Sequence, residues 1–265
     1  MVGYPLSIIA AAVVPPLGYA VLLGALDRRR PRPWRAFGAA FVWGIVAAAF
    51  GAAPLNDLLL AHLGGAADET RARALAATAG APVIEELLKG LGPLLLLLLR
   101  PDLLRTPRDG LVCGGFVGLG FDLAEGLEYL MIAAVQGGYA GVARGVWVRG
   151  ILAGLKHAVF TGTTGAGLGW ARTVSGRRAR IVIPLAALVA AIVQHAVWNA
   201  VASEAITKAL CGASPAEPRC LPSPPGVALF ISVPIIVALC LGPGALVLGA
   251  LARRGGAPDP GRQNR

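Results

Sequence analysis

Ionisable side chains occur inside segments of this sequence that are otherwise almost entirely apolar. The clearest case is APVIEELLKG, residues 81–90, which places Glu85, Glu86 and Lys89 in a run of alanine, leucine and glycine. An ionisable group in hydrocarbon costs about 2.5 to 3.5 kcal/mol even on lenient insertion scales, so such groups face a protein interior and are candidates for function. The segment therefore predicts a buried functional site.

Three further apolar segments carry polar residues of the same kinds. They contribute, in chain order, Asp122, Glu125 and Glu128; Arg149, Lys156 and His157; and His195 and Asn199. With a rise of about 1.5 Å per residue, Glu85, Glu125 and the two histidines lie about 16 to 22 Å from one end of their segments. We therefore expect these four side chains to meet at mid-depth around a water-filled cavity.

Glutamate and histidine beside water can hydrolyse an amide bond in two ways. In the first, both histidines and one glutamate hold Zn²⁺ with an open fourth position, and another glutamate deprotonates the water bound there. In the second no metal takes part: a buried glutamate is the general base, and histidine with asparagine stabilises the developing oxyanion. The spacing does not distinguish between these two mechanisms.

Several of these charges also have a purely structural interpretation as ion pairs. Oppositely charged residues three or four apart share a helix face, and a long side chain near a segment end can extend toward the interface. Glu86 and Lys89 could form such a pair or act in catalysis. Arg149, near a segment end, could pair with Glu128, and Lys156 could be a counter-ion for Asp122.

The composition identifies an integral membrane protein. The 265 residues have a mean hydropathy of +0.68 and only 14% charged residues, whereas a soluble globular protein carries about a quarter. Segments that approach or exceed the ~20 residues of a membrane span lie at 4–26, 36–60, 74–99, 110–135, 145–171, 181–202 and 227–251. We predict an all-α polytopic transmembrane helical bundle of about seven spans.

The arginine-rich connectors predict the orientation of these spans. DRRRPRPWR, RPDLLRTPRD, RTVSGRRAR and the C-terminal tail alternate with connectors that are poorer in arginine, which places the amino terminus outside and the carboxyl terminus in the cytoplasm. We expect a single domain over 1–265, with a motif-bearing core at about 74–204 and a flexible tail at 252–265.

The net charge of +10 is explained by these connectors. Because no basic face interleaved with aromatic residues is visible, we expect no nucleic-acid partner; the partner of the basic ends is the lipid bilayer. Cys113 is expected to be a small packing residue. Cys211 and Cys220 share one outer loop, where either a disulfide or two free thiols is consistent with the sequence.

Four motifs occur in order on consecutive spans. They read APVIEELLKG, GFVGLGFDLAEGLEYL, RGILAGLKHAVFTGTTGAGLG and HAVWN. In this order they resemble the motifs of the PrsW family of bacterial intramembrane proteases, which is related to the CAAX prenyl endopeptidase and bacteriocin-processing superfamily. The resemblance covers about Ala81 to Asn199.

The resemblance implies site residues at the matching positions. Those implied as catalytic are Glu85, Glu86, His157, His195 and Asn199, with Lys89, Glu125, Glu128 and Arg149 in support. In the prenyl-protease relatives the positions of Glu85 and His157 activate water, while those of His195 and Asn199 form the oxyanion hole. PrsW proteins are usually described as metallopeptidases, for which Glu85, His157 and His195 would be the metal ligands, so both Zn²⁺ and a metal-free mechanism stay open.

Two positions depart from the family pattern. The second motif usually has asparagine directly after its glutamate, where this chain has Gly126, and Lys156 precedes the histidine of the third motif. These departures imply a site of altered polarity, or a pocket that binds without cutting.

We therefore expect an intramembrane peptidase in a bacterial cytoplasmic membrane that cleaves a membrane-anchored protein, an anti-sigma factor in the best-known members. Two other functions fit the same buried groups. A proton-coupled transporter would use them as a relay, and a non-catalytic scaffold would bind transmembrane helices through small-residue faces such as GTTGAGLG.

Overall fold

The computed structural model describes residues 3–26, 34–64 and 68–202, and over these residues it contains helices and no strand. The α-helices are α1 (Gly3–Leu26), α2 (Trp34–Trp43), α3 (Phe50–Gly64), α4 (Glu69–Leu75), α5 (Ala81–Leu99), α6 (Pro107–Gly145), α7 (Lys156–Ala171) and α8 (Arg177–Val197). Short π-helical segments join or extend them: η1 (Gly44–Ala49), η2 (Ala76–Gly80), η3 (Val146–Leu152) and η4 (Trp198–Ala202). The predicted span at 227–251, the cysteines 211 and 220 and the tail 252–265 lie outside the described residues.

The all-α prediction is confirmed for the described part of the chain, and four stretches of it are long and apolar enough to cross a membrane. They are Leu6–Ala25, Trp34–Gly64, Pro107–Ala171 and Arg177–Ala200. The segment at 74–99 is not among them, because Glu85, Glu86 and Lys89 make it too polar on composition alone; it is nevertheless helical from Glu69 to Leu99. The count of seven spans and the orientation of the termini stay predictions.

The stretch Pro107–Ala171 is a helical hairpin rather than one long rod. Its chain reverses at Gly138, whose φ of 56° lies in the left-handed region that glycine adopts without strain. After the reversal, Gly141 packs against the backbone oxygen of Ala133 so closely that a Cβ would not fit. This turn falls between the two spans expected at 110–135 and 145–171.

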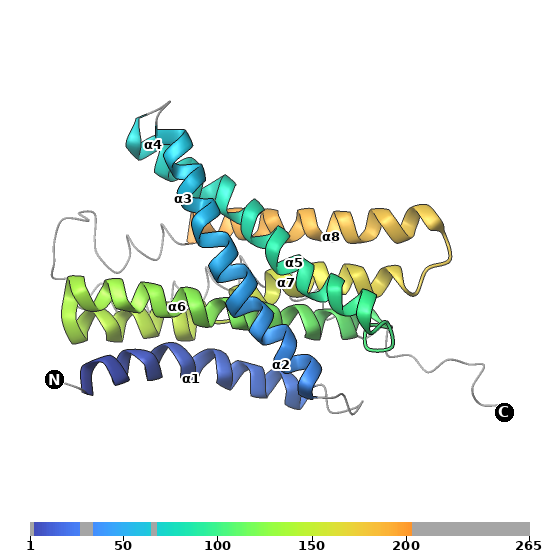
Figure 1. Cartoon of the computed structure of the whole chain (residues 1–265), viewed down its shortest axis with the longest axis horizontal. Helices are drawn as coiled ribbons and strands as arrows, with labels where there is room; N and C mark the ends of the chain where they lie inside the picture. The colour runs from blue at the N-terminus through green and yellow to red at the C-terminus, as the bar shows by residue number, and fades with distance from the viewer. Residues whose placement is uncertain (1–2, 27–33, 65–67, 203–265) are drawn as a thin grey trace.

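The helices form two crossing groups (Figure 1). The helices α1, α6, α7 and α8 run roughly along the long axis, while α2–α3 and α5 cross them obliquely. In the most apolar 18-residue stretch of the hairpin Pro107–Ala171, 67% is buried. The corresponding share is 17 to 24% in the three other candidate spans. The hairpin is therefore the centre of the molecule, and the other helices turn most of their apolar surface toward lipid.

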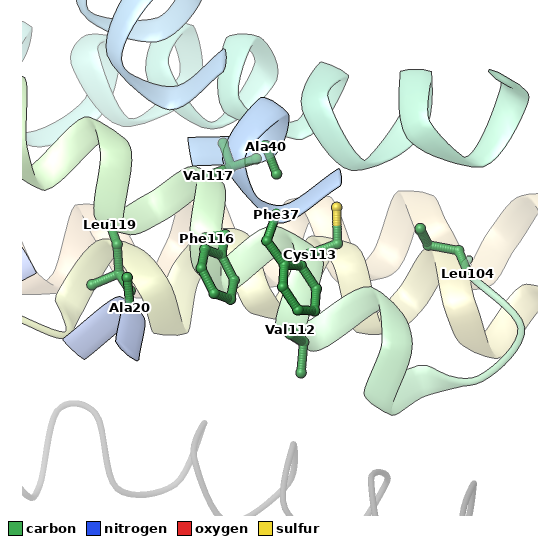
Figure 2. Close-up of a cluster of buried hydrophobic side chains, with 9 residues drawn as sticks. All are labelled: Ala20, Phe37, Ala40, Leu104, Val112, Cys113, Phe116, Val117 and Leu119. Atoms are coloured by element: carbon green, nitrogen blue, oxygen red, sulfur yellow. The ribbon is translucent and has the colours of Figure 1, made fainter. Parts of the chain in front are cut away.

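A cluster of apolar side chains fastens α1 and α2 to the first arm of the hairpin (Figure 2). Phe37 of α2 stacks on Phe116 of α6 with ring centroids 4.5 Å apart and planes only 4° from parallel. Around them Ala20 and Leu119 join α1 to α6, and Cys113 is buried in the same cluster. The packing role expected for Cys113 is confirmed.

Glycines allow α6 and α7 to approach almost backbone to backbone. On α6 they recur every fourth residue, at Gly110, Gly114 and Gly118. A Cβ at these positions would collide with the backbones of Gly165, Thr161 and His157, respectively. Small residues with this spacing are the usual device for close helix contact in membranes, and here they fix the height of α7, and thus of His157, against α6.

The second arm of the hairpin is broken close to the polar residues. The π-helical η3 ends at Leu152, and residues 153–155 are not helical before α7 begins at Lys156. Such breaks at membrane depth occur where the backbone is enclosed by protein or lines a polar cavity. The break places Lys156 and His157 in the first turn of α7.

We expect Gly118→Ala to destabilise the protein by about 1 to 3 kcal/mol, the usual range for overpacking, because the new methyl group would meet the backbone of His157. The matched control on the same helix is Gly126→Ala, whose Cβ meets nothing within 4 Å. The measurement is the unfolding midpoint of both variants in detergent. Equal midpoints would contradict the packing argument.

Candidate active site

The polar residues predicted to converge do so in one buried cluster. The donor atoms of Glu85 on α5, His157 on α7 and His195 on α8 all lie within 4.8 Å of one another. All three residues are buried, with exposed fractions of 7%, 0% and 2%. The expected meeting of the first acidic pair with both imidazoles is confirmed, whereas the water-filled cavity expected around them stays a prediction.

Glu86 is fully buried, and each of its oxygens has a partner. One oxygen lies 2.6 Å from Lys89 Nζ and 3.0 Å from His195 Nδ1, and the other accepts a hydrogen bond of 3.1 Å from the hydroxyl of Thr161. The ion pair expected between Glu86 and Lys89 is therefore present. With its lone pairs occupied, Glu86 is suited to hold other side chains in place.

Glu85 has the longest hydrogen bonds of the four carboxylates in the cluster. Its Oε1 accepts from the Asn56 amide at 3.3 Å, and its Oε2 lies 3.4 Å from Lys89 Nζ. The same Oε2 lies 3.8 Å from His195 Nε2, which is too far for a hydrogen bond and leaves room for one bridging atom. Since Nδ1 of His195 faces Glu86, the neutral ring that donates there presents a free lone pair at Nε2.

His157 joins this half of the cluster to a second half. Its Nδ1 lies 3.0 Å from Lys89 Nζ, and its Nε2 lies 3.0 Å from Glu125 Oε2. Because an ammonium group can only donate, Nδ1 accepts from Lys89 and Nε2 donates to Glu125. The carboxylate of Glu125 thus fixes the orientation of His157, as Glu86 fixes that of His195.

The second half consists of two carboxylates and two cations. Lys156 donates to Asp122 at 2.7 Å and to Glu125 at 3.1 Å, so the pairing expected for Lys156 and Asp122 is confirmed. Arg149 lies 2.5 Å from Glu125. The pairing expected between Arg149 and Glu128 is wrong: Glu128 is exposed, and Glu125, one turn earlier on α6, is the residue that faces the interior.

Aromatic rings enclose both imidazoles. Phe160 stacks on His195 with centroids 5.0 Å apart and planes 20° from parallel, and Phe121 meets the ring of His157 edge-on at 4.7 Å. Lys89 Nζ lies 3.9 Å from the centroid of Phe121, a cation–π distance. These rings restrict the histidines to the orientations that the carboxylates set.

Comparison with known proteins identifies the family of this chain. The sequence profile of the PrsW family intramembrane metalloproteases matches residues 32–239, well over half of the chain. The chain belongs to this family. It is thus a peptidase of the intramembrane metalloprotease type and an integral membrane protein. No curated protein and no solved structure gives a significant match.

The described residues of this PrsW protein fit a metal ion. Glu85, His157 and His195 supply one carboxylate oxygen and two imidazole nitrogens, which is the composition of catalytic zinc sites with an open fourth position. For His157 to bind a metal through Nδ1, Lys89 would have to give up its hydrogen bond to that nitrogen. Each histidine also has a carboxylate at its other nitrogen, as metal-binding histidines usually do. A second group of donors, Asp122, Glu125 and His157, is also close enough, but Lys156 and Arg149 already neutralise it.

Charge balance supports the same interpretation. The cluster contains four carboxylates, Glu85, Glu86, Asp122 and Glu125, and three cationic side chains, Lys89, Arg149 and Lys156. With both histidines neutral, one negative charge stays uncompensated in a buried place, where unpaired charge is costly. The cluster is therefore suited to take up one further cation or a proton.

Two residues of the predicted set lie at the margin of the cluster. Asn199, in η4, donates its amide to the backbone oxygen of Ala77 in η2 at 2.8 Å. Glu128 is exposed. Sequence reasoning missed Asn56 and Thr161, although Thr161 is four residues after His157 on the same helix face, and Asn56 is one of the few polar residues in its span.

The position where the family usually has asparagine opens onto a small cavity. Gly126 lines a space of about 20 Å³ together with Asp122, Arg149 and the Pro15–Pro16 pair of α1, enough for one water molecule. A Cβ at Gly126 would meet nothing within 4 Å. Asp122 Oδ2 and Arg149 Nε are buried there without a hydrogen-bond partner among the described residues.

We expect Gly126→Asn to raise or preserve stability. The added amide enters open space beside these two polar atoms, and asparagine is a better helix residue than glycine. The measurement is the unfolding midpoint in detergent, with Gly120→Asn as a control, because a Cβ at Gly120 would collide with the backbone of Phe41. Equal loss of stability in both variants would show that the space is not available.

Proposed function

We propose that this protein hydrolyses a peptide bond of a membrane-anchored protein at the cluster around Glu85, His157 and His195. The observation that carries the proposal is the meeting of these donors from three helices, with Glu86 and Glu125 orienting the two imidazoles. By analogy with the best-known members of the family, the substrate would be an anti-sigma factor in a bacterial cytoplasmic membrane.

In the proposed mechanism Glu85 is the proton acceptor. Its contacts are long, 3.3 Å to Asn56 and 3.4 Å to Lys89, whereas Asp122 is paired with Lys156 at 2.7 Å. The lone pairs of Glu85 can therefore accept a proton from an attacking water. The water oxygen bonds to the carbonyl carbon, its proton passes to Glu85, and the same proton moves to the amine nitrogen as the C–N bond breaks.

The other residues of the cluster hold and orient the side chains that act on the substrate. Glu86 holds His195 and Lys89, and Glu125 holds His157. In the metal-dependent alternative, Glu85, His157 and His195 would instead hold Zn²⁺, which when bound supplies Lewis-acid polarisation and lowers the pKa of its water. Glu85 would then be a ligand, and another glutamate would accept the proton. The free Nε2 lone pair of neutral His195 favours this ligand role over oxyanion donation. Asn199 is the proposed oxyanion donor, and it would exchange its bond to Ala77 for one to the substrate.

Glu85→Gln and His157→Ala should each lower cleavage of a co-expressed single-span substrate by at least about a hundredfold, since each removes a group that acts in the transition state. Glu128→Gln is the matched control, because Glu128 is an exposed acid on a neighbouring helix face. The measurement is cleavage on immunoblots alongside the amount of folded protein. Full activity of either site variant would rule out the mechanism.

Metal content is a separate prediction. We expect about one zinc per chain in protein purified without chelator, because three ligands of the right kinds are assembled, and a content near background in His195→Ala. Elemental analysis measures this without reference to activity, and Glu128→Gln again serves as the control. A chelated, metal-free protein that cleaves at the full rate would contradict the zinc proposal.

A further inference from the structure

An apolar groove is lined by residues of α5, α7 and α8. Its volume is about 540 Å³. The walls are formed mainly by leucines, including Leu87, Leu91 and Leu94 of α5 and Leu185 and Leu188 of α8. Leu87 and Leu185 are 49% and 57% exposed, so the groove opens sideways toward the surrounding lipid.

One end of the groove lies within about one helical turn of the candidate active site, although no residue of the polar cluster lines the groove. Its wall residues Leu87 and Gly90 flank Glu86 and Lys89 in the sequence of α5. Its lining residue Thr164 comes one helical turn after Thr161, which donates to Glu86. A segment in this groove would therefore run along the membrane and end beside the polar cluster.

The hydroxyl of Thr164 is buried in this groove without a hydrogen-bond partner among the described residues. The residue is only 4% exposed. A threonine in a membrane helix normally donates to the carbonyl four residues earlier, as the neighbouring Thr163 does to Val159 at 2.8 Å. A hydrocarbon chain has nothing to offer such a hydroxyl, whereas the backbone of a locally unwound peptide offers both N–H and C=O groups.

The other end of the groove is cationic. Arg172, which directly follows α7, and Arg180, in the first turn of α8, line it. They lie about 12 Å along the helices from the level of Thr164, by the rise per residue. A transmembrane segment with acidic residues directly after its apolar stretch would complement this end.

We propose that the groove is the docking site for the transmembrane segment of the substrate, with Thr164 binding its unwound backbone and Arg172 and Arg180 selecting an acidic flank. The inference rests on the proposed function for the identity of the occupant. The segment would lie in the half of the membrane nearest the α7–α8 turn. Its scissile bond would reach the cluster at the end of the groove that is farther from Arg172 and Arg180.

Photo-crosslinking tests docking without requiring cleavage. The Glu85→Gln protein would carry benzoylphenylalanine in place of Leu94 or Leu188, and the probe is a single-span reporter of leucine and alanine with a central Gly-Gly. The control position is Val189, which follows Leu188 on α8 but is 59% exposed outside the groove. We expect reporter adducts from both groove positions and few from Val189.

Two reporters that differ only in the flank facing the α7–α8 turn test the selectivity. An Asp-Asp flank should give about fivefold more adduct than a Lys-Lys flank, since each basic residue at the membrane surface contributes appreciably to such pairing. The difference should disappear in the Arg172→Gln/Arg180→Gln protein.

In the catalytically competent protein, Thr164→Val should raise KM for the acidic reporter about three- to tenfold with little change in kcat, because it removes one hydrogen bond.

The outcomes separate this inference from the proposed function. Adducts without cleavage by the unmodified protein would support docking and contradict the peptidase mechanism. Cleavage without groove adducts would leave the mechanism and overturn the docking site. Adducts only to lipid, or only to residues 203–265 of the same chain, would show that something else fills the groove and would also overturn it.

Discussion

The neutralisation of carboxylates by Lys89 in a water-poor interior is the interaction on which the site depends. Its ammonium group contacts Glu86 at 2.6 Å, His157 at 3.0 Å and Glu85 at 3.4 Å, and lies over the ring of Phe121. Without this cation, two adjacent glutamates on one helix could not both stay charged in hydrocarbon. The same contacts tie α5 to α6 and α7, so the electrostatic requirement of the site also holds the fold together around it.

His157 connects two groups of charges that are balanced differently. On the Glu125 side, two carboxylates face two cations, and this half is internally compensated. On the Glu85 side, two carboxylates share Lys89, and His195 Nε2 has a free acceptor position toward Glu85. The compensated half is suited to orienting His157, while the other half has capacity for a cation or a proton and is therefore where the chemistry is expected. This division explains how so many ionisable groups can serve a single reaction.

Close packing of the glycine face of α6 sets the precision of this arrangement. Because Gly118 lies directly on the backbone of His157, the imidazole height is fixed by backbone contact rather than by a flexible side chain. The broken span before Lys156 turns α7 into this position. On the lipid side, α5, α7 and α8 form the apolar groove, one end of which lies within about one helical turn of the cluster. The close-packed interior supports the proposed active site, and the laterally open groove supports the proposed docking of a membrane segment.

The sequence by itself determined the helical membrane fold, the turn near Gly138 and the convergence of Glu85, His157 and His195, because apolar runs and the cost of buried charge leave few alternatives. It did not determine the partners within the cluster. The pairing of Arg149 with Glu125 rather than Glu128, the contribution of Asn56 from a different span and the break before Lys156 were decided only by tertiary structure. The spacing of residues in the sequence determines which side chains share a helix face. Which of these side chains contact a neighbouring helix depends on how the helix is rotated about its axis, and that rotation is set by close packing across several spans.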